Sequence, residues 1–380
     1  MSQPGPLHPD LDPGGLMEFS VVFNDRSLNH MSQRFQGVMR DLSSMLREVY
    51  SAGGVALVPG GGTCAMEAVA RQFLSGESAL ILRNGWFSFR WSQIVDAGCL
   101  TETAAVVKAR RPDGVADPQA PFAPPPLEEV VRAIREREPA VVFAPHVETS
   151  AGVILPDSYV AALGSAAREV GALFVLDCIA SGCAWVDMKA LDVDLLVTAP
   201  QKGWSGQPCA GVVLFSQRAM ERLGETSSSS FALDLAKWRD IMAAYEAGGH
   251  AYHATLPTDA LLVFRDAVRE TMEMGLDRAK VAQWELGDGV RGLLRDRGVA
   301  SVAAEGFGAP GVVVAYTDRP DVSSGRAFLD VGAQIAAGVP LRCDEGDDFQ
   351  TFRLGLFGLD KLADVPGTLT RMETVLDQVF

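Results

Sequence analysis

Leu173-Phe174-Val175-Leu176-Asp177 and Leu195-Leu196-Val197-Thr198 are two apolar runs, and each leads directly into polar residues. The first run ends in a carboxylate, and the second is followed by Ala199-Pro200-Gln201-Lys202. Short runs without polar interruption are typical of strands that are buried on both faces of a parallel sheet. We therefore expect Asp177 and Lys202 at the same edge of one sheet, beyond the carboxyl ends of its strands.

Apolar runs and amphipathic segments alternate through most of the first 250 residues. The expected strands cover residues 55–58, 78–82, 140–144, 172–176, 194–198 and 210–215, and helices are expected at 64–74, 127–137 and 157–170. This alternation predicts an α/β fold, in which a mostly parallel sheet is wrapped by helices. The Pro-rich segment 117–126 is expected to be a surface connection.

The pattern changes near residue 258. Long helices are expected over 261–274 and 281–297, followed by short strands around 299–304 and 311–316. We therefore expect residues 1–257 to form an N-terminal arm and a large α/β domain, and residues 258–380 to form a smaller carboxyl-terminal α+β domain.

Composition narrows the class of protein. The chain has 380 residues, 48% of them hydrophobic, and a net charge of −15. No stretch contains five or more clustered lysines and arginines, so binding to nucleic acid or to anionic lipid is not expected. No signal peptide is read at the amino terminus and no apolar stretch reaches 18 residues, so no membrane span is expected.

The six cysteines are scattered without a CxxC pair, which argues against a zinc site and a disulfide framework. They favour a reducing cytoplasm. His250 and His253 have a spacing that could share a helix face, but no acidic partner accompanies them, so no metal is expected.

The pair formed by Lys202 and Asp177 suits a pyridoxal phosphate site. That cofactor needs a lysine to hold its aldehyde as a Schiff base, and an acid to keep its pyridine nitrogen protonated. A surface lysine and a helix-capping aspartate are the alternatives, because both residue types are common where a strand meets a loop.

A glycine turn strengthens this interpretation. Residues 55–58 run into Gly60-Gly61-Gly62-Thr63, so a strand, a turn and a helix start follow one another. Free backbone N–H groups at a helix start bind anions, although many such turns bind nothing. The turn lacks the GK[ST] ending of a nucleotide loop and the GxGxxG spacing of a dinucleotide turn, which leaves a simple phosphate group as the favoured ligand.

Taken together, these motifs resemble those of the class V aminotransferases, which are pyridoxal phosphate enzymes of fold type I, and within them the alanine-glyoxylate and serine-glyoxylate group. The resemblance covers most of the chain and rests on Pro4-Gly5-Pro6, Gly60-Gly61-Gly62-Thr63, Asn84-Gly85, His146-Val147-Glu148-Thr149-Ser150-Ala151-Gly152-Val153, Asp177, Gln201-Lys202, Tyr252-His253-Ala254-Thr255 and Phe352-Arg353-Leu354-Gly355.

The resemblance implies a catalytic role for two residues. Lys202 would carry the cofactor and then, once freed, move the proton from the substrate Cα. Asp177 would pair with the pyridinium nitrogen. Further cofactor contacts are implied for Gly61, Gly62, Thr63, Phe87, Thr149, Ser150, Ile179 and Gln201.

Among these contacts, Phe87 and Ile179 would cover the two faces of the cofactor ring, with Trp86 as the rival for stacking. Either Thr149 or Ser150 would bond to the 3′ oxygen, and both remain open. Gly62, Thr63 and Gln201 would reach the phosphate.

The resemblance also implies a homodimer and a substrate clamp. Tyr252 and Thr255 match positions that reach the phosphate of the neighbouring subunit, and simple interdomain packing is the alternative. Arg353 matches the arginine that binds the substrate carboxylate as a bidentate pair.

The implied reaction is transamination between a small amino acid, such as alanine or serine, and a small 2-oxo acid, such as glyoxylate or pyruvate. The alternative is a cysteine desulfurase or lyase of the same fold that uses Cys343 as its nucleophile. A noncatalytic protein of this fold is a third possibility, against which the set of Lys202, Asp177 and Arg353 argues.

Two segments depart from what is common in the family. Asn24-Asp25-Arg26-Ser27 replaces a His-Arg-Ser element that often shapes the substrate pocket, so the substrate is left open. The acidic residues 344–348 form either a solvated loop or a group that screens Arg353 or recognises a substrate amine.

Overall fold

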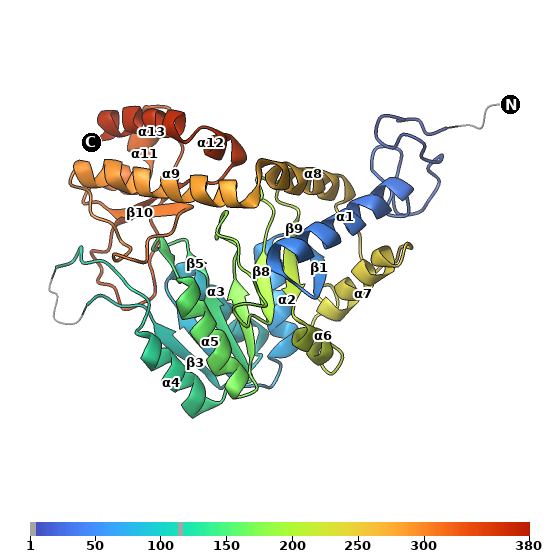
Figure 1. Ribbon diagram of the computed structural model, residues 1–380, viewed down its shortest axis with the longest axis horizontal. Helices are drawn as coiled ribbons and strands as arrows, with labels where there is room; N and C mark the ends of the chain where they lie inside the picture. Colours follow the sequence, from blue (N-terminus) through green and yellow to red (C-terminus); the bar gives the residue numbers. More distant parts are fainter. Residues whose placement is uncertain (1–4, 113–116) are drawn as a thin grey trace.

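The computed structural model describes residues 5–112 and 117–380, so Pro4 of the first motif lies outside the described residues. A seven-stranded sheet forms the centre, in the order β1-β9-β8-β7-β4-β2-β3 (Figure 1). Only β9 runs antiparallel to its neighbours β1 and β8. The strands are β1 (Gly54–Pro59), β2 (Ala79–Arg83), β3 (Ala104–Lys108), β4 (Val141–Pro145), β7 (Leu173–Asp177), β8 (Leu195–Thr198) and β9 (Ala210–Phe215). The predicted α/β fold with a mostly parallel sheet is confirmed.

Helices pack against this sheet: α2 on β9, α3 on β2, α5 on β7 and α7 on β1. The helices of this part are α1 (Gln33–Tyr50), α2 (Gly62–Phe73), α3 (Trp86–Gly98), α4 (Leu127–Arg137), α5 (Asp157–Glu169), α6 (Gln217–Leu223) and α7 (Leu235–Glu246). The chain before α1 forms an arm that projects away from the sheet (Figure 1).

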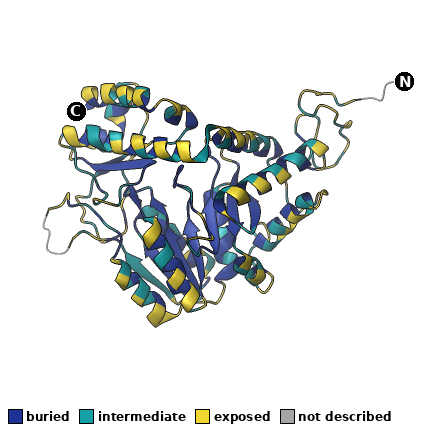
Figure 2. Cartoon of the chain, in the orientation of Figure 1, coloured by how far each residue is buried: buried dark blue, intermediate teal, exposed yellow. Residues whose placement is uncertain are grey.

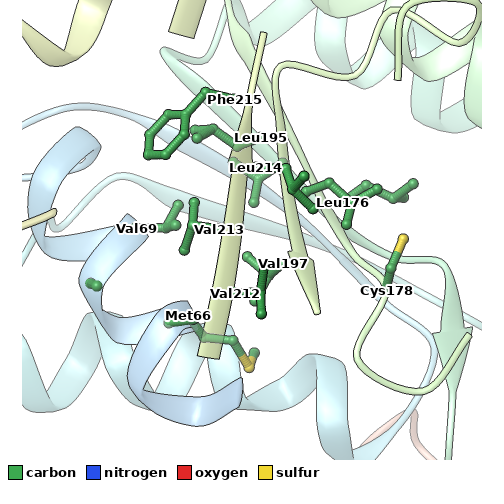
Figure 3. Packing of buried hydrophobic residues seen from close by; sticks show 14 of the residues in the cluster. Met66, Val69, Leu176, Cys178, Leu195, Val197, Val212, Val213, Leu214 and Phe215 are labelled. Atoms are coloured by element: carbon green, nitrogen blue, oxygen red, sulfur yellow. The ribbon is translucent and has the colours of Figure 1, made fainter. Parts of the chain in front are cut away.

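The strands are buried almost throughout, and the outer faces of the helices are exposed (Figure 2). Figure 3 shows the packing at the centre, where Met66 and Val69 of α2 meet Val212 and Val213 of β9. All four side chains are at most 1% exposed. Removing such apolar surface from water is the main stabilising contribution to the sheet, at roughly 25 cal/mol per Å².

The last part of the chain builds a smaller layer. A three-stranded antiparallel sheet in the order β10-β12-β11 packs with α9 and α13 in a second hydrophobic cluster. The elements are α8 (Thr258–Met274), α9 (Leu276–Asp296), β10 (Val312–Tyr316), α10 (Pro320–Ser323), α11 (Arg326–Asp330), β11 (Ala336–Ala337), β12 (Thr351–Gly355), α12 (Leu359–Ala363) and α13 (Val365–Val379).

Helix α8 begins where the second domain was expected, yet its buried Leu261, Phe264 and Val268 belong to the first hydrophobic cluster. The division into residues 1–257 and 258–380 therefore stays a prediction.

Two local expectations are wrong. Residues 299–304 make isolated bridges, such as Ser301 with Ala315, and no regular strand. The Pro-rich segment is also more than a surface connection, because Phe122 is 2% exposed and its N–H donates to the carbonyl of Val302.

Among the described residues, no helix combines the length and the apolar character that crossing a membrane would require.

Candidate active site

Asp177 and Lys202 follow neighbouring parallel strands. Asp177 ends β7 and lies opposite Val197 of β8, and the chain then turns into Lys202. Asp177 is 7% exposed, and its Oδ1 accepts a hydrogen bond of 3.0 Å from the N–H of Ile179. Burial raises the pKa of Asp177 to about 7, and this hydrogen bond only partly opposes the shift.

Lys202 is half-buried, and burial lowers the pKa of its amine. The nearby cations Arg353 and Arg90 lower this pKa further. Its Nζ lies 5.3 Å from the centre of the Phe357 ring. A larger share of this amine is therefore uncharged at neutral pH than for a solvated lysine.

The glycine turn lies against the segment that follows Asp177. Helix α2 begins at Gly62, directly after β1 and residues 60–61. A Cβ at Gly62 would lie 2.5 Å from Cδ1 of Ile179, so a larger residue there would require the Ile179 side chain to shift. The free N–H groups at the start of α2 are thereby held beside Asp177 and Ile179.

Glu148, in the two-residue strand β5 (Val147–Glu148), is fully buried and caps helix α3. Its Oε1 accepts from the N–H of Phe87 at 3.1 Å, and its Oε2 accepts from the N–H and hydroxyl of Ser88 at 2.9 and 2.6 Å. A carboxylate at a helix start is stabilised by the free N–H groups and by the helix dipole. Glu148 therefore fixes the backbone at Phe87.

Ser150 belongs to the same network. Its hydroxyl donates to Oε1 of Glu148 at 2.7 Å and accepts from the N–H of Trp86 at 2.9 Å. Thr149 is half-buried, and its hydroxyl has no hydrogen-bond partner within the described part of the chain. Of these two candidates, only Thr149 has a hydroxyl that is not engaged in holding α3.

The ring of Phe87 lies close to two guanidinium groups. The Cζ of Arg90 is 4.7 Å from the ring centre and the Cζ of Arg353 is 5.4 Å from it. Nη1 of Arg90 donates to Oγ1 of Thr63 at 3.1 Å, so this side chain also joins α3 to the glycine turn. Sequence analysis missed Arg90, although its place three residues after Phe87 puts both on one helix face.

Arg353 lies in β12, and its Nε donates to the carbonyl of Ala337 at 2.8 Å. Burial lowers the pKa of Arg353, and Glu148 opposes this shift. Two acids of the 344–348 loop make contacts away from Arg353. Asp344 pairs with Lys108 at 2.7 Å, and Glu345 accepts from the N–H of Arg342 at 2.9 Å.

Three of the predicted site residues, Gln201, Tyr252 and Thr255, make no hydrogen bond to the other predicted site residues around Lys202 in the part of the chain that the structure describes. Gln201 is half-buried, and its Oε1 has no partner among the described residues. Tyr252 is 53% exposed and its hydroxyl lies 3.2 Å from that of Thr255. The ring of Tyr252 packs on His30, and within residues 5–112 and 117–380 no hydrogen bond or ring contact joins Tyr252 or Thr255 to Lys202 or to the glycine turn.

These residues fit pyridoxal phosphate. A buried acid, a half-buried amine, an aromatic ring and a glycine turn gather around one sheet edge, and Lys202, Arg90 and Arg353 form no ion pair with any described acid. Such a surplus of cations suits an anionic ligand. In the described residues, no group of three or more His, Cys, Asp or Glu side chains is arranged to hold a metal ion.

Comparisons with known proteins identify the family to which the chain belongs. A model of the family described as aminotransferase class-V matches residues 19–305. The chain is 27% identical over 334 residues to alanine–glyoxylate aminotransferase 1 of Saccharomyces cerevisiae, with 82% of each chain covered. It is 28% identical over 257 residues to an L-aspartate–glyoxylate aminotransferase of Paracoccus denitrificans, which covers 67% of this chain and 60% of that protein.

A solved structure shows the same fold. The crystal structure of an alanine–glyoxylate aminotransferase from Nostoc sp. has a TM-score of 0.76 with 24% identity, and the match covers 92% of this chain and 89% of that chain. The chain therefore belongs to the class-V aminotransferase family, and the family predicted from the motifs is confirmed. It is a pyridoxal-phosphate-dependent aminotransferase.

The desulfurase alternative is not favoured. Cys343 is 4% exposed, and its Sγ donates to the carbonyl of Arg83 at 3.4 Å. Burial and the nearby Glu148 raise the pKa of this thiol well above its usual range. A buried and protonated thiol is a poor nucleophile.

We expect Glu148→Ala to destabilise the cofactor-free protein by at least about 2 kcal/mol, because buried donors at Phe87, Ser88 and Ser150 lose their acceptor. Glu148→Gln, which keeps one acceptor oxygen, should cost less. Urea unfolding measures the effect, with Glu136→Ala as the control, since that side chain is 68% exposed. Equal unfolding midpoints for Glu148→Ala and Glu136→Ala would contradict the capping role.

The raised pKa of Asp177 predicts a pH dependence of stability. Between about pH 4 and pH 7 the folded cofactor-free protein holds a proton that the unfolded chain has released, so the free energy of unfolding falls as pH rises through this window. One proton gives a slope of at most about 1.4 kcal/mol per pH unit.

Asp177→Asn should remove this contribution. Urea unfolding at several pH values measures the effect. As pH rises towards 7, the unfolding free energy of the wild-type protein should fall relative to that of the variant, and above pH 7 the difference should stay constant. A difference that stays constant with pH would show that Asp177 titrates normally.

Proposed function

We propose that this enzyme transfers an amino group between a small amino acid, such as alanine or serine, and a small 2-oxo acid, such as glyoxylate or pyruvate. The observation that carries the proposal is the guanidinium of Arg353, which has no acid partner among the described residues and lies near Phe87 at the edge that holds Lys202. A guanidinium in this position suits the carboxylate that both substrates share. The activities named for the relatives, with alanine or L-aspartate and glyoxylate, support this substrate class.

In this proposal Lys202 and Asp177 are the catalytic residues. The amine of Lys202 is the attachment point for the cofactor aldehyde, and in its uncharged form it moves a proton at the substrate Cα. The carboxylate of Asp177 holds a proton on the pyridine nitrogen. When bound, pyridoxal phosphate supplies an electron-accepting ring.

The remaining residues position the cofactor. Phe87 and Ile179 would cover its ring, and Gly61, Gly62, Thr63 and Gln201 would reach its phosphate. We assign the 3′ oxygen to Thr149, because Ser150 already donates its hydroxyl proton to Glu148. This assignment chooses between the two residues that the sequence left open.

We also propose a homodimer with shared active sites. The N-terminal arm exposes large apolar side chains, with Leu16 87%, Phe19 83% and Val21 102% exposed. A second copy of the chain would cover this surface. The exposure of Tyr252 and Thr255 supports their role in the site of the neighbouring subunit. The six free cysteines support a reducing compartment, for which we propose the cytoplasm.

Cofactor attachment and substrate class can be tested together. Borohydride reduction followed by peptide mapping should place the pyridoxyl group on Lys202, and Lys202→Ala should lose it, whereas Lys237→Ala at an exposed position should keep it. Alanine or serine should then change the cofactor absorbance in the first half-reaction, and glyoxylate or pyruvate should restore it. A label on another lysine, or no response to any of these substrates, would refute the proposal.

Shared active sites predict complementation between inactive subunits. Subunits carrying Lys202→Ala and subunits carrying Tyr252→Ala with Thr255→Ala should each be weakly active or inactive alone. A mixed dimer of the two should recover up to half of the wild-type activity, because one of its sites is intact. No recovery in a purified mixed dimer would place Tyr252 and Thr255 in their own subunit, and a monomer in size-exclusion chromatography would exclude the dimer.

A further inference from the structure

Arg90 is a half-buried cation that the assigned roles do not use. It lies in the first part of α3, the helix that Glu148 caps, and its guanidinium packs on Phe87 with a Cζ-to-centre distance of 4.7 Å. Its Nη1 donates to Oγ1 of Thr63 at 3.1 Å. No acid within the described ranges pairs with it.

The position beside Thr63 determines what this guanidinium can bind. Thr63 is the second residue of α2, so the free N–H groups and the positive end of the helix dipole lie at the same place. A guanidinium that meets a helix start adds positive charge to positive charge. An anion bound to both groups would offset this proximity of like charges.

Electrostatics at the neighbouring catalytic residues support this view. The charge of Arg90 acts on both Asp177 and Lys202: it partly opposes the rise that burial causes in the pKa of Asp177, and it adds to the lowering of the pKa of Lys202 by burial and Arg353. Arg353 is the other guanidinium near Phe87, and it extends from β12 rather than from the turn. The two arginines therefore approach the site from different elements, and only Arg90 contacts the glycine turn.

We propose that Arg90 binds the phosphate of the cofactor, together with the backbone N–H groups at the start of α2. The proposal rests on the proposed function, since it assigns a phosphate-binding residue within the same site. Because α3 carries both Phe87 and Arg90, one rigid helix start would hold the ring and the phosphate at once. Glu148, which fixes that helix start, then acts on cofactor binding through both residues.

The test compares two ligands that differ only by the phosphate. Cofactor-free wild-type protein, Arg90→Gln and Arg90→Lys are titrated with pyridoxal phosphate and with pyridoxal, and imine formation is followed by absorbance. Arg90→Gln should weaken binding of pyridoxal phosphate by about 10-fold to 100-fold, the range for one charge-assisted hydrogen bond, and leave binding of pyridoxal within about twofold. Arg90→Lys should fall between Arg90→Gln and the wild-type protein.

Arg83→Gln is a matched control. Arg83 is a nearby half-buried arginine whose guanidinium lies on Phe89 and donates to Ser92, away from the glycine turn. The Arg83→Gln variant should bind pyridoxal phosphate and pyridoxal as tightly as the wild-type protein does. Inorganic phosphate should also compete with pyridoxal phosphate more strongly in the wild-type protein than in Arg90→Gln.

Three results would overturn the proposal. Equal weakening of both ligands in Arg90→Gln would make Arg90 a structural residue. A loss seen only in the KM for the amino donor, at saturating cofactor, would assign the guanidinium to the substrate. If the wild-type protein forms no imine with either ligand, both the proposed function and this proposal fail. If it forms the imine but Arg90→Gln binds pyridoxal phosphate as tightly as the wild-type protein does, only the role of Arg90 is refuted.

Discussion

The buried carboxylate of Glu148 is the interaction on which the geometry of the site depends. Its two oxygens accept five hydrogen bonds, all from the first turn of α3 and from Ser150. A fully buried charge is tolerated in a protein only when its hydrogen-bonding capacity is satisfied in this way. Because the same turn carries Phe87 and leads to Arg90, this polar network fixes the positions of two residues that we propose to contact the cofactor.

Charge is distributed unevenly over the molecule. The whole chain carries a net charge of −15, yet three cations converge at the edge of the sheet where Asp177 and the N-terminus of α2 also lie. Burial shifts the amine of Lys202 and the carboxyl group of Asp177 towards their neutral forms. An anionic ligand that enters this environment would compensate the cations, and a cationic group bound beside Asp177 would favour the ionised form of this residue. Binding and ionisation are therefore linked at this site.

The sequence predicted six of the seven strands of the central sheet from their apolar runs, and it predicted Asp177 and Lys202 at one edge because parallel strands end together. It did not predict β3, because this edge strand is only half-buried and its apolar signal is correspondingly weaker. The role of Glu148 was missed although the residue was part of a motif. Its partners Phe87 and Ser88 lie about 60 positions away in the sequence, and no local sequence pattern predicts hydrogen bonds over that separation.

The segment of residues 299–309 forms a seam between the two sheets. Its backbone bonds on one side to Phe122 and Gly152 of the large layer, and on the other side to Val314 of β10. Because these hydrogen bonds are made by backbone atoms, they connect the two sheets whatever side chains the segment carries. Arg353 lies on β12, which pairs with β10, so this segment links the strand that carries Arg353 to the part of the chain that carries Lys202.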